Sequence, residues 1–233
     1  MNILITGANR GLGLALAAEA CARGHQVLGG VRGPSSSADR LLELIAEYPG
    51  QLTILPLDVA DENSVRYAYG QAASRISSLD SVINSAAILL GREQKLEQLD
   101  FDQVEQSFQT NLFGPMAVLK YFLPLLRKGK RQSIINISSE AGSFAGAYGG
   151  DFSYALSKSA LNMFSAQLRR ELSPQGYLVH AVHPGWIRTD MGGEQAPGDA
   201  AVAAAGILNI VERKTEAAEN ALFIDSNGNP MSL

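Results

Sequence analysis

Cysteines, runs of positive charge and long hydrophobic stretches are what this 233-residue chain has least of. Its longest apolar stretches are far shorter than the roughly 20 residues that span a bilayer, so no membrane partner is expected. No lysine- or arginine-rich run could neutralise a nucleic-acid backbone, and the net charge is -4. The single cysteine, Cys21, cannot form an internal disulfide, which is typical of a reducing compartment. The composition therefore predicts a cytoplasmic globular protein.

Short apolar runs alternate with helical segments along the whole chain. The runs do not alternate polar with apolar residues, which is typical of strands covered on both faces. The predicted strands are Asn2–Thr6, Gln26–Val31, Leu52–Leu57, Ser81–Asn84, Ser133–Ser138, Leu178–His183 and Ala221–Ile224, with a loop at 33–37. The main predicted helices are Leu12–Arg23, Asp61–Ile76, Phe101–Leu126 and Tyr154–Leu172.

This order predicts one α/β domain over residues 1–233. Strand–helix alternation implies right-handed crossovers, and so a Rossmann-type, doubly wound parallel sheet of about seven strands with helices on both faces. No linker rich in proline, glycine or serine divides the chain. Ligands of such a sheet bind at the C-terminal ends of its strands.

A glycine-rich turn follows the first predicted strand. Gly7, Gly11 and Gly13 have the spacing G-x-x-x-G-x-G, which differs from the G-x-G-x-x-G fingerprint of dinucleotide sites. Here Gly7 would allow the tight turn, Gly11 the approach of a diphosphate, and Gly13 close packing of helix on strand. The free N–H groups at the helix start would attract phosphates. A plain turn is the alternative, but the strand before it and the helix after it favour dinucleotide binding.

Arg32 follows the second predicted strand, where NAD-binding sheets carry an acidic residue. A guanidinium there suits the 2′-phosphate of NADP, because it offers a charged, bidentate donor. Arg10, inside the glycine turn, would add a second positive charge. The alternative is an ordinary solvated arginine. The pair favours NADP over NAD.

Tyr154 and Lys158 lie four residues apart on a predicted helix, and so on one face of it. A nearby ammonium is expected to lower the phenol pKa from about 10 towards neutrality, as acid–base catalysis requires. Upstream, Ser138 and Ser139 end a predicted strand at the ligand-binding edge. The alternatives are an exposed tyrosine and lysine without function, and serines that only satisfy backbone amides.

Pro115 lies inside the predicted helix Phe101–Leu126 and cannot donate a hydrogen bond to the carbonyl of Asn111. We therefore expect a kink that leaves this carbonyl free to hold a water molecule, unless the kink has no functional consequence. The three histidines, His25, His180 and His183, have no metal-ligand spacing and are interpreted as structural, and no metal is expected.

In these features the chain resembles the classical short-chain dehydrogenases/reductases over nearly its whole length. The matching pieces, in order, are Thr6–Gly13, Asp58-Val59, Asn84-Ser85-Ala86-Ala87, Asn111, Ser139, Tyr154–Lys158 and Pro184-Gly185. Residues 183–193 are most similar to the carbonyl-reductase-like branch that includes C-factor proteins. Ser85 and Ala87 depart from the usual fourth-strand motif.

The resemblance implies site residues for the whole reaction. The catalytic residues would be Asn111, Ser139, Tyr154 and Lys158. Asp58 would bind the adenine, Asn84 and Ala86 the adenosine ribose, Lys158 the nicotinamide ribose, and Ile187 and Thr189 the carboxamide. The predicted cofactor-binding residues are Gly7, Asn9, Arg10, Gly11, Leu12, Gly13, Arg32, Asp58, Val59, Asn84, Ala86, Tyr154, Lys158, Pro184, Gly185, Ile187 and Thr189.

The expected activity is NADP(H)-dependent hydride transfer between a carbonyl and an alcohol, with Tyr154 as general acid/base, Ser139 as donor to the carbonyl oxygen and NADPH preferred over NADH. Two alternatives are weighed: a catalytically weak signalling or redox-sensing protein on the same fold, and a methyltransferase, which leaves Tyr154–Lys158 unexplained. A substrate lid is expected at roughly 186–210, with Phe144, Tyr148, Trp186 and Met191 near an apolar pocket. Family members often pair through the helices 101–126 and 154–172, so a homodimer or homotetramer is expected.

Overall fold

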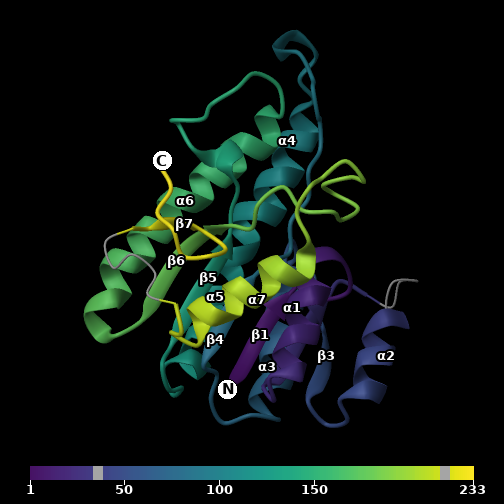
Figure 1. The fold of residues 1–233 in the computed structure, drawn as a ribbon, viewed down its shortest axis with the longest axis vertical. Coiled ribbons are helices and arrows are strands. Elements are labelled where there is room, and N and C mark those ends of the chain that lie inside the picture. Colours follow the sequence, from purple (N-terminus) through teal and green to yellow (C-terminus); the bar gives the residue numbers. More distant parts are fainter. Residues whose placement is uncertain (34–38, 216–220) are drawn as a thin grey trace.

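Seven parallel strands form one sheet in the computed structural model, which describes residues 1–33, 39–215 and 221–233 (Figure 1). The strands run in the spatial order β3-β2-β1-β4-β5-β6-β7, so the winding reverses between β1 and β4. This confirms the predicted doubly wound sheet. The strand bounds are β1 Asn2–Thr6, β2 Gln26–Val31, β3 Leu52–Pro56, β4 Ser81–Asn84, β5 Ser133–Ile137, β6 Leu178–His183 and β7 Phe223–Asp225. The last strand begins two residues later than predicted, and the predicted loop at 33–37, except Gly33, lies outside the described residues.

Helices cover both faces of the sheet (Figure 1). Neighbouring residues of β1 point to opposite cores. Ile3 and Ile5 pack with α1 (Gly11–Ala22) and α7 (Ala200–Val211), whereas Leu4 packs with α3 (Glu62–Ala73) and α5 (Gly114–Leu126). The helix bounds are α1 Gly11–Ala22, α2 Asp39–Glu47, α3 Glu62–Ala73, α4 Phe101–Phe108, α5 Gly114–Leu126, α6 Phe152–Leu172 and α7 Ala200–Val211. None of the helices in the described ranges is long and apolar enough to cross a membrane.

The predicted helix Phe101–Leu126 is two α-helices joined by a π-helical turn, Gln109–Phe113. We expected Pro115 to interrupt a helix. Instead it lies in the first turn of α5, where a backbone N–H group is not needed. The irregularity is the wider turn around Asn111 itself. Single π-turns inside α-helices are frequent at functional sites.

Candidate active site

A cavity of about 770 Å³ lies at the C-terminal ends of the strands, beside the point where the winding reverses. Loops that follow six of the strands contribute to its wall. Most of the predicted site residues line it: Gly7, Asn9, Arg10, Gly11, Leu12, Gly13, Arg32, Asp58, Val59, Ala86, Ser139, Tyr154, Lys158, Pro184, Gly185, Ile187 and Thr189. Two of them, Asn84 and Asn111, are buried and do not line it.

The glycine turn forms one end of the cavity. Gly7 has a φ of +68°, and a Cβ atom on Gly13 would lie 2.1 Å from the carbonyl oxygen of Gly7. Neither position therefore accepts a side chain without rearrangement. Helix α1 begins at Gly11 without a side-chain cap and without an acidic residue in its first turn. Its N–H groups and positive dipole end fit a diphosphate.

Thr6 attaches the glycine turn to the loop that follows β4. Its hydroxyl oxygen accepts hydrogen bonds from the backbone N–H groups of Ser85 and Ala86, both at 3.0 Å. One side chain therefore connects the glycine turn to the loop after β4. This role of Thr6 was not predicted, although a threonine at the end of an otherwise apolar strand is a signal for one.

The two arginines predicted to read a 2′-phosphate differ in their surroundings. Arg32 is exposed at the edge of the cavity. Arg10 pairs with Asp190 across the cavity mouth, with 3.2 Å between Nη1 and Oδ2, and both side chains are more than half exposed. Asp190 therefore offsets part of the charge that Arg10 was expected to supply.

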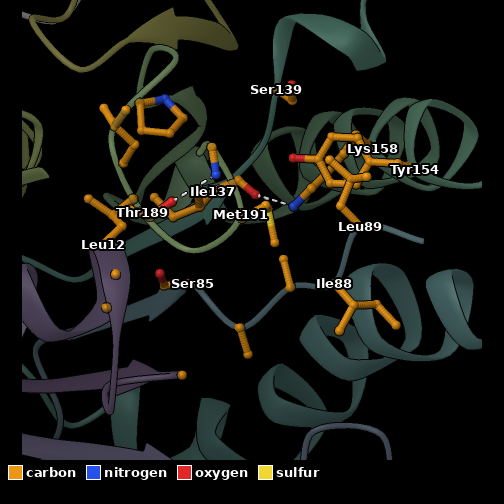
Figure 2. A pocket seen from close by; sticks show the side chains of 18 of the residues that line it. Leu12, Ser85, Ile88, Leu89, Ile137, Ser139, Tyr154, Lys158, Thr189 and Met191 are labelled. Atoms are coloured by element: carbon orange, nitrogen blue, oxygen red, sulfur yellow. Dashed lines mark hydrogen bonds between the residues drawn. The ribbon is translucent and has the colours of Figure 1, made fainter. Parts of the chain in front are cut away.

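Tyr154 and Lys158 lie side by side on one face of α6, at the other end of the cavity (Figure 2). The ammonium nitrogen of Lys158 is 5.6 Å from the centre of the Tyr154 ring and donates a 2.7 Å hydrogen bond to the carbonyl of Ile137. The Ser139 side chain lies close enough to Tyr154 to lower the pKa of its phenol. The phenol, the serine and the ammonium therefore converge at the end of β5.

The expected lowering of the Tyr154 pKa is wrong for this structure. Burial raises the pKa of Tyr154 to about 12, and the nearby Ser139 side chain opposes this only in part. Burial likewise lowers the pKa of Lys158 to about 7. The error arose because spacing on a helix predicts which side chains are neighbours, whereas desolvation depends on everything packed around them. At neutral pH the phenol is therefore protonated.

Asn111 makes three hydrogen bonds through its side chain. The side-chain oxygen accepts from the N–H of Ile88 at 2.9 Å, and the amide nitrogen donates to the Ile88 carbonyl at 2.9 Å. The same nitrogen donates to Ser157 at 3.0 Å, and Ser157 in turn donates to the Tyr154 carbonyl at 2.7 Å. Asn111 therefore connects the loop after β4 to the turn of α6 that carries Tyr154.

The wall of the cavity contains both apolar and polar side chains. Figure 2 shows Leu89 close to Tyr154 and Lys158. Ile88, Leu89, Trp186 and Met191 supply the apolar part, as expected for the last two. Phe144 is not part of the wall, contrary to our prediction, and is 80% exposed. Several polar lining residues in the loops after β4 and β5 were not predicted: Arg92, Glu140 and Asp151.

His183 also lines the cavity, so our interpretation of it as purely structural was incomplete. Its Nδ1 atom accepts a 3.3 Å hydrogen bond from the N–H of Glu140, next to Ser139. Its position at the last residue of β6 was the available signal.

The segment predicted as a lid contains two different structures. Residues 184–192 form irregular chain beside the cavity, apart from Arg188 all in its wall, whereas α7 begins at Ala200. Ala203, Ala204 and Ile207 of α7 are buried in the core that includes α1.

Comparisons with known proteins agree with this geometry. The family model described as short chain dehydrogenase matches residues 1–200. The short-chain dehydrogenase anuI of Penicillium roqueforti is 32% identical over 95% of this chain and 91% of its own length. The C-signal protein of Myxococcus xanthus is 34% identical over 58% of this chain and 81% of its own length. The NADPH-bound carbonyl reductase from chicken fatty liver superposes with a TM-score of 0.90 at 31% identity, over 100% of this chain and 98% of that one.

Proposed function

The chain belongs to the short-chain dehydrogenase family of oxidoreductases, and on that premise we propose that it is a cytoplasmic, NADP(H)-dependent carbonyl reductase. One observation carries the proposal. Tyr154, whose raised pKa keeps its phenol protonated at neutral pH, stands beside Ser139 and the Lys158 ammonium at the end of a cavity whose other end is the glycine turn.

The residues of the cavity fit a dinucleotide. The uncapped start of α1 would hold the diphosphate, and Arg32 would bind a 2′-phosphate at the cavity edge. Asp58 keeps one carboxylate oxygen in a 3.0 Å bond with the N–H of Ala60, which orients the group beside the adenine end. Bound NADPH would supply the hydride for the reaction.

The chain's own residues would then provide the proton and hold the substrate carbonyl in position. Ser139 donates a hydrogen bond to the carbonyl oxygen of the substrate, where negative charge develops. Tyr154 gives its proton to that oxygen as the carbon becomes tetrahedral, and the product is the alcohol. Its raised pKa keeps the proton available at neutral pH. Lys158 stands where its charge would stabilise the phenolate left behind.

The apolar part of the cavity wall indicates the substrate class. Ile88, Leu89, Trp186 and Met191 favour the apolar part of an aldehyde, ketone or quinone. We therefore expect turnover in a screen of such compounds that follows NADPH consumption.

The decisive test is the Tyr154→Phe variant. Because it lacks only the hydroxyl group, it should bind NADPH like the wild type in a fluorescence titration. Its turnover should fall by about 10²–10⁴-fold, the usual contribution of a positioned acid.

Tyr148→Phe is the matched control, because Tyr148 lines the same cavity but hydrogen-bonds to Asp151 at 3.2 Å. It should retain most of the turnover. Wild-type turnover in Tyr154→Phe would refute the mechanism.

A second candidate function is a nucleotide-binding signalling or redox-sensing protein with little turnover. The similarity to the C-signal protein favours it. Tight NADPH binding without oxidation across the whole carbonyl screen would support this function over the reductase.

We further propose that two copies pair through α5 and α6. Large apolar side chains between 42% and 62% exposed lie on these elements: Phe113 at the end of the π-turn before α5, Met116 on α5, and Leu156 and Met163 on α6. Light scattering coupled to size-exclusion chromatography should give a dimer or tetramer mass; a monomer mass would contradict this.

A further inference from the structure

Ser139 stands between two segments that are both attached to helix α6. It follows Ser138 at the end of β5 and precedes the short 3₁₀ turn Glu140–Gly142. Its own hydroxyl accepts a 3.2 Å bond from the N–H of Ala141, which lies within that turn. The position of this hydroxyl relative to Tyr154 therefore depends on how the strand end and the turn are held against the helix.

Asn162 makes both attachments. Its side-chain oxygen accepts a 2.6 Å hydrogen bond from the Ser138 hydroxyl, and its amide nitrogen donates a 3.1 Å hydrogen bond to the Gly142 carbonyl. Asn162 is 3% exposed and Ser138 2% exposed, so water does not compete for these bonds. One amide group thus bridges the residues on either side of the segment that contains Ser139.

The same stripe of α6 carries the other catalytic groups. Tyr154, Lys158 and Asn162 follow one another at intervals of four residues and therefore lie along one face of the helix. The turn also touches this helix directly, because a Cβ atom on Gly142 would lie 2.6 Å from the backbone carbon of Lys158. The helix that positions the phenol and the ammonium therefore also holds the serine.

We propose that Asn162 is a positioning residue of the reaction, which fixes Ser139 relative to Tyr154 by fastening both ends of its segment to α6. The inference rests on the proposed function, since it assigns Ser139 a role in that reaction. A shift of about 1 Å in a positioned group can cost about 10²-fold in rate. Asn162 and Gly142 do not line the cavity, so Asn162 acts on the reaction through the segment that it holds, in which Ser139 is the residue next to Tyr154.

A double-mutant cycle separates this role from simple support of the fold. Asn162→Ala should lower kcat by about 10–100-fold while leaving the Kd for NADPH within about twofold. In the Ser139→Ala background, the same change should lower kcat by less than about threefold, because the hydroxyl that Asn162 positions is no longer present. Losses that multiply in the double variant would overturn the proposal.

Ser165→Ala is the matched control on the same helix. Ser165 is buried and accepts a 2.8 Å hydrogen bond from Asn136, so its removal breaks a comparable bond away from Ser139. It should lower the unfolding midpoint as Asn162→Ala does, yet leave kcat within about twofold of the wild type. If Asn162→Ala does not fold, Ser138→Ala removes one of the two bonds and should show the same pattern at smaller size.

Hydrogen exchange tests whether Asn162 attaches the Ser139 segment to α6, and it does not require turnover. In Asn162→Ala, amides of residues 138–143 should exchange faster, whereas in Ser165→Ala they should exchange as in the wild type. Unchanged exchange in Asn162→Ala would overturn the inference. A wild-type protein that oxidises no NADPH would instead contradict the proposed function, so the two failures are distinguishable.

Discussion

Lys158 and Tyr154 show that residues proposed to act in catalysis can be unfavourable for folding. Each is almost completely buried, and burial favours the neutral form of each side chain. It lowers the pKa of Lys158 to about 7 and raises the pKa of Tyr154 to about 12. Such opposite shifts in neighbouring groups are typical of sites that exchange protons. The Ile137 carbonyl, which accepts from the ammonium, compensates only part of the desolvation.

Arg32 is the residue on which the proposed cofactor preference depends, because Arg10 is already paired with Asp190. Arg32→Asp should remove a charged hydrogen bond worth about 1.5–3 kcal/mol and so lower the ratio of kcat/KM with NADPH to that with NADH by about 10–100-fold. Steady-state kinetics with both cofactors measure this ratio.

Arg75→Asp makes the same change of charge at an exposed position outside the cavity wall. It should leave the ratio near the wild-type value. A wild-type protein that uses both cofactors equally would contradict the NADP preference.

Among the elements, the π-turn Gln109–Phe113 does most to connect the cavity to the helices behind it. It places Asn111 where one side chain reaches both the loop after β4 and helix α6. A regular helix would rotate this side chain away from one of them, because each additional residue turns the helix by about 100°.

Asn111→Ala should therefore affect stability and activity together. It leaves the N–H and carbonyl of Ile88 without their partners, at about 1–3 kcal/mol for each group, so the free energy of unfolding should fall in urea titrations. The KM for the carbonyl substrate should rise, because Ile88 lines the cavity.

Ser157→Ala removes only one of the three bonds of Asn111 and should cost less stability. If Asn111→Ala left both the unfolding curve and KM unchanged, the connecting role of the π-turn would be excluded.

For the whole molecule, both faces of the sheet are covered, so a polar group inside a strand has no access to water. His180, in the middle of β6, is 1% exposed, and burial together with the Arg169 guanidinium lowers its pKa to about 4. Between pH 6.5 and pH 4 the unfolded chain takes up a proton that the folded protein does not. Stability is therefore lost as the pH falls through this range.

His180→Gln should reduce this loss by up to about 3 kcal/mol, since one pKa unit corresponds to about 1.4 kcal/mol. The measurement compares urea unfolding of the variant and the wild type at pH 7.5 and pH 4.5. The remaining slope belongs to other groups, such as Glu212 and Asp225, whose lowered pKa values act in the same direction. Equal pH dependence in the two proteins would contradict the assignment.

The order of elements was predictable because it rests on local rules. Strand bounds such as Asn2–Thr6 and Gln26–Val31 agree with the structure, since an apolar run and its flanking turn residues lie within a few positions of each other. The glycine turn and the Tyr154–Lys158 pair were found for the same reason. Most of the predicted lining residues followed, because parallel strands bring their C-terminal ends to one edge.

The sequence by itself thus determined the doubly wound fold, the cavity edge and the residue types available there. Only the tertiary structure decided that Arg10 pairs with Asp190, that Asn111 binds through its side chain, and that Asn162 attaches the Ser139 segment to α6. The partners in these contacts are between 23 and 180 residues apart. Hydrogen bonds at such separations, and the desolvation that raises the Tyr154 pKa, depend on packing in three dimensions, which no local pattern encodes.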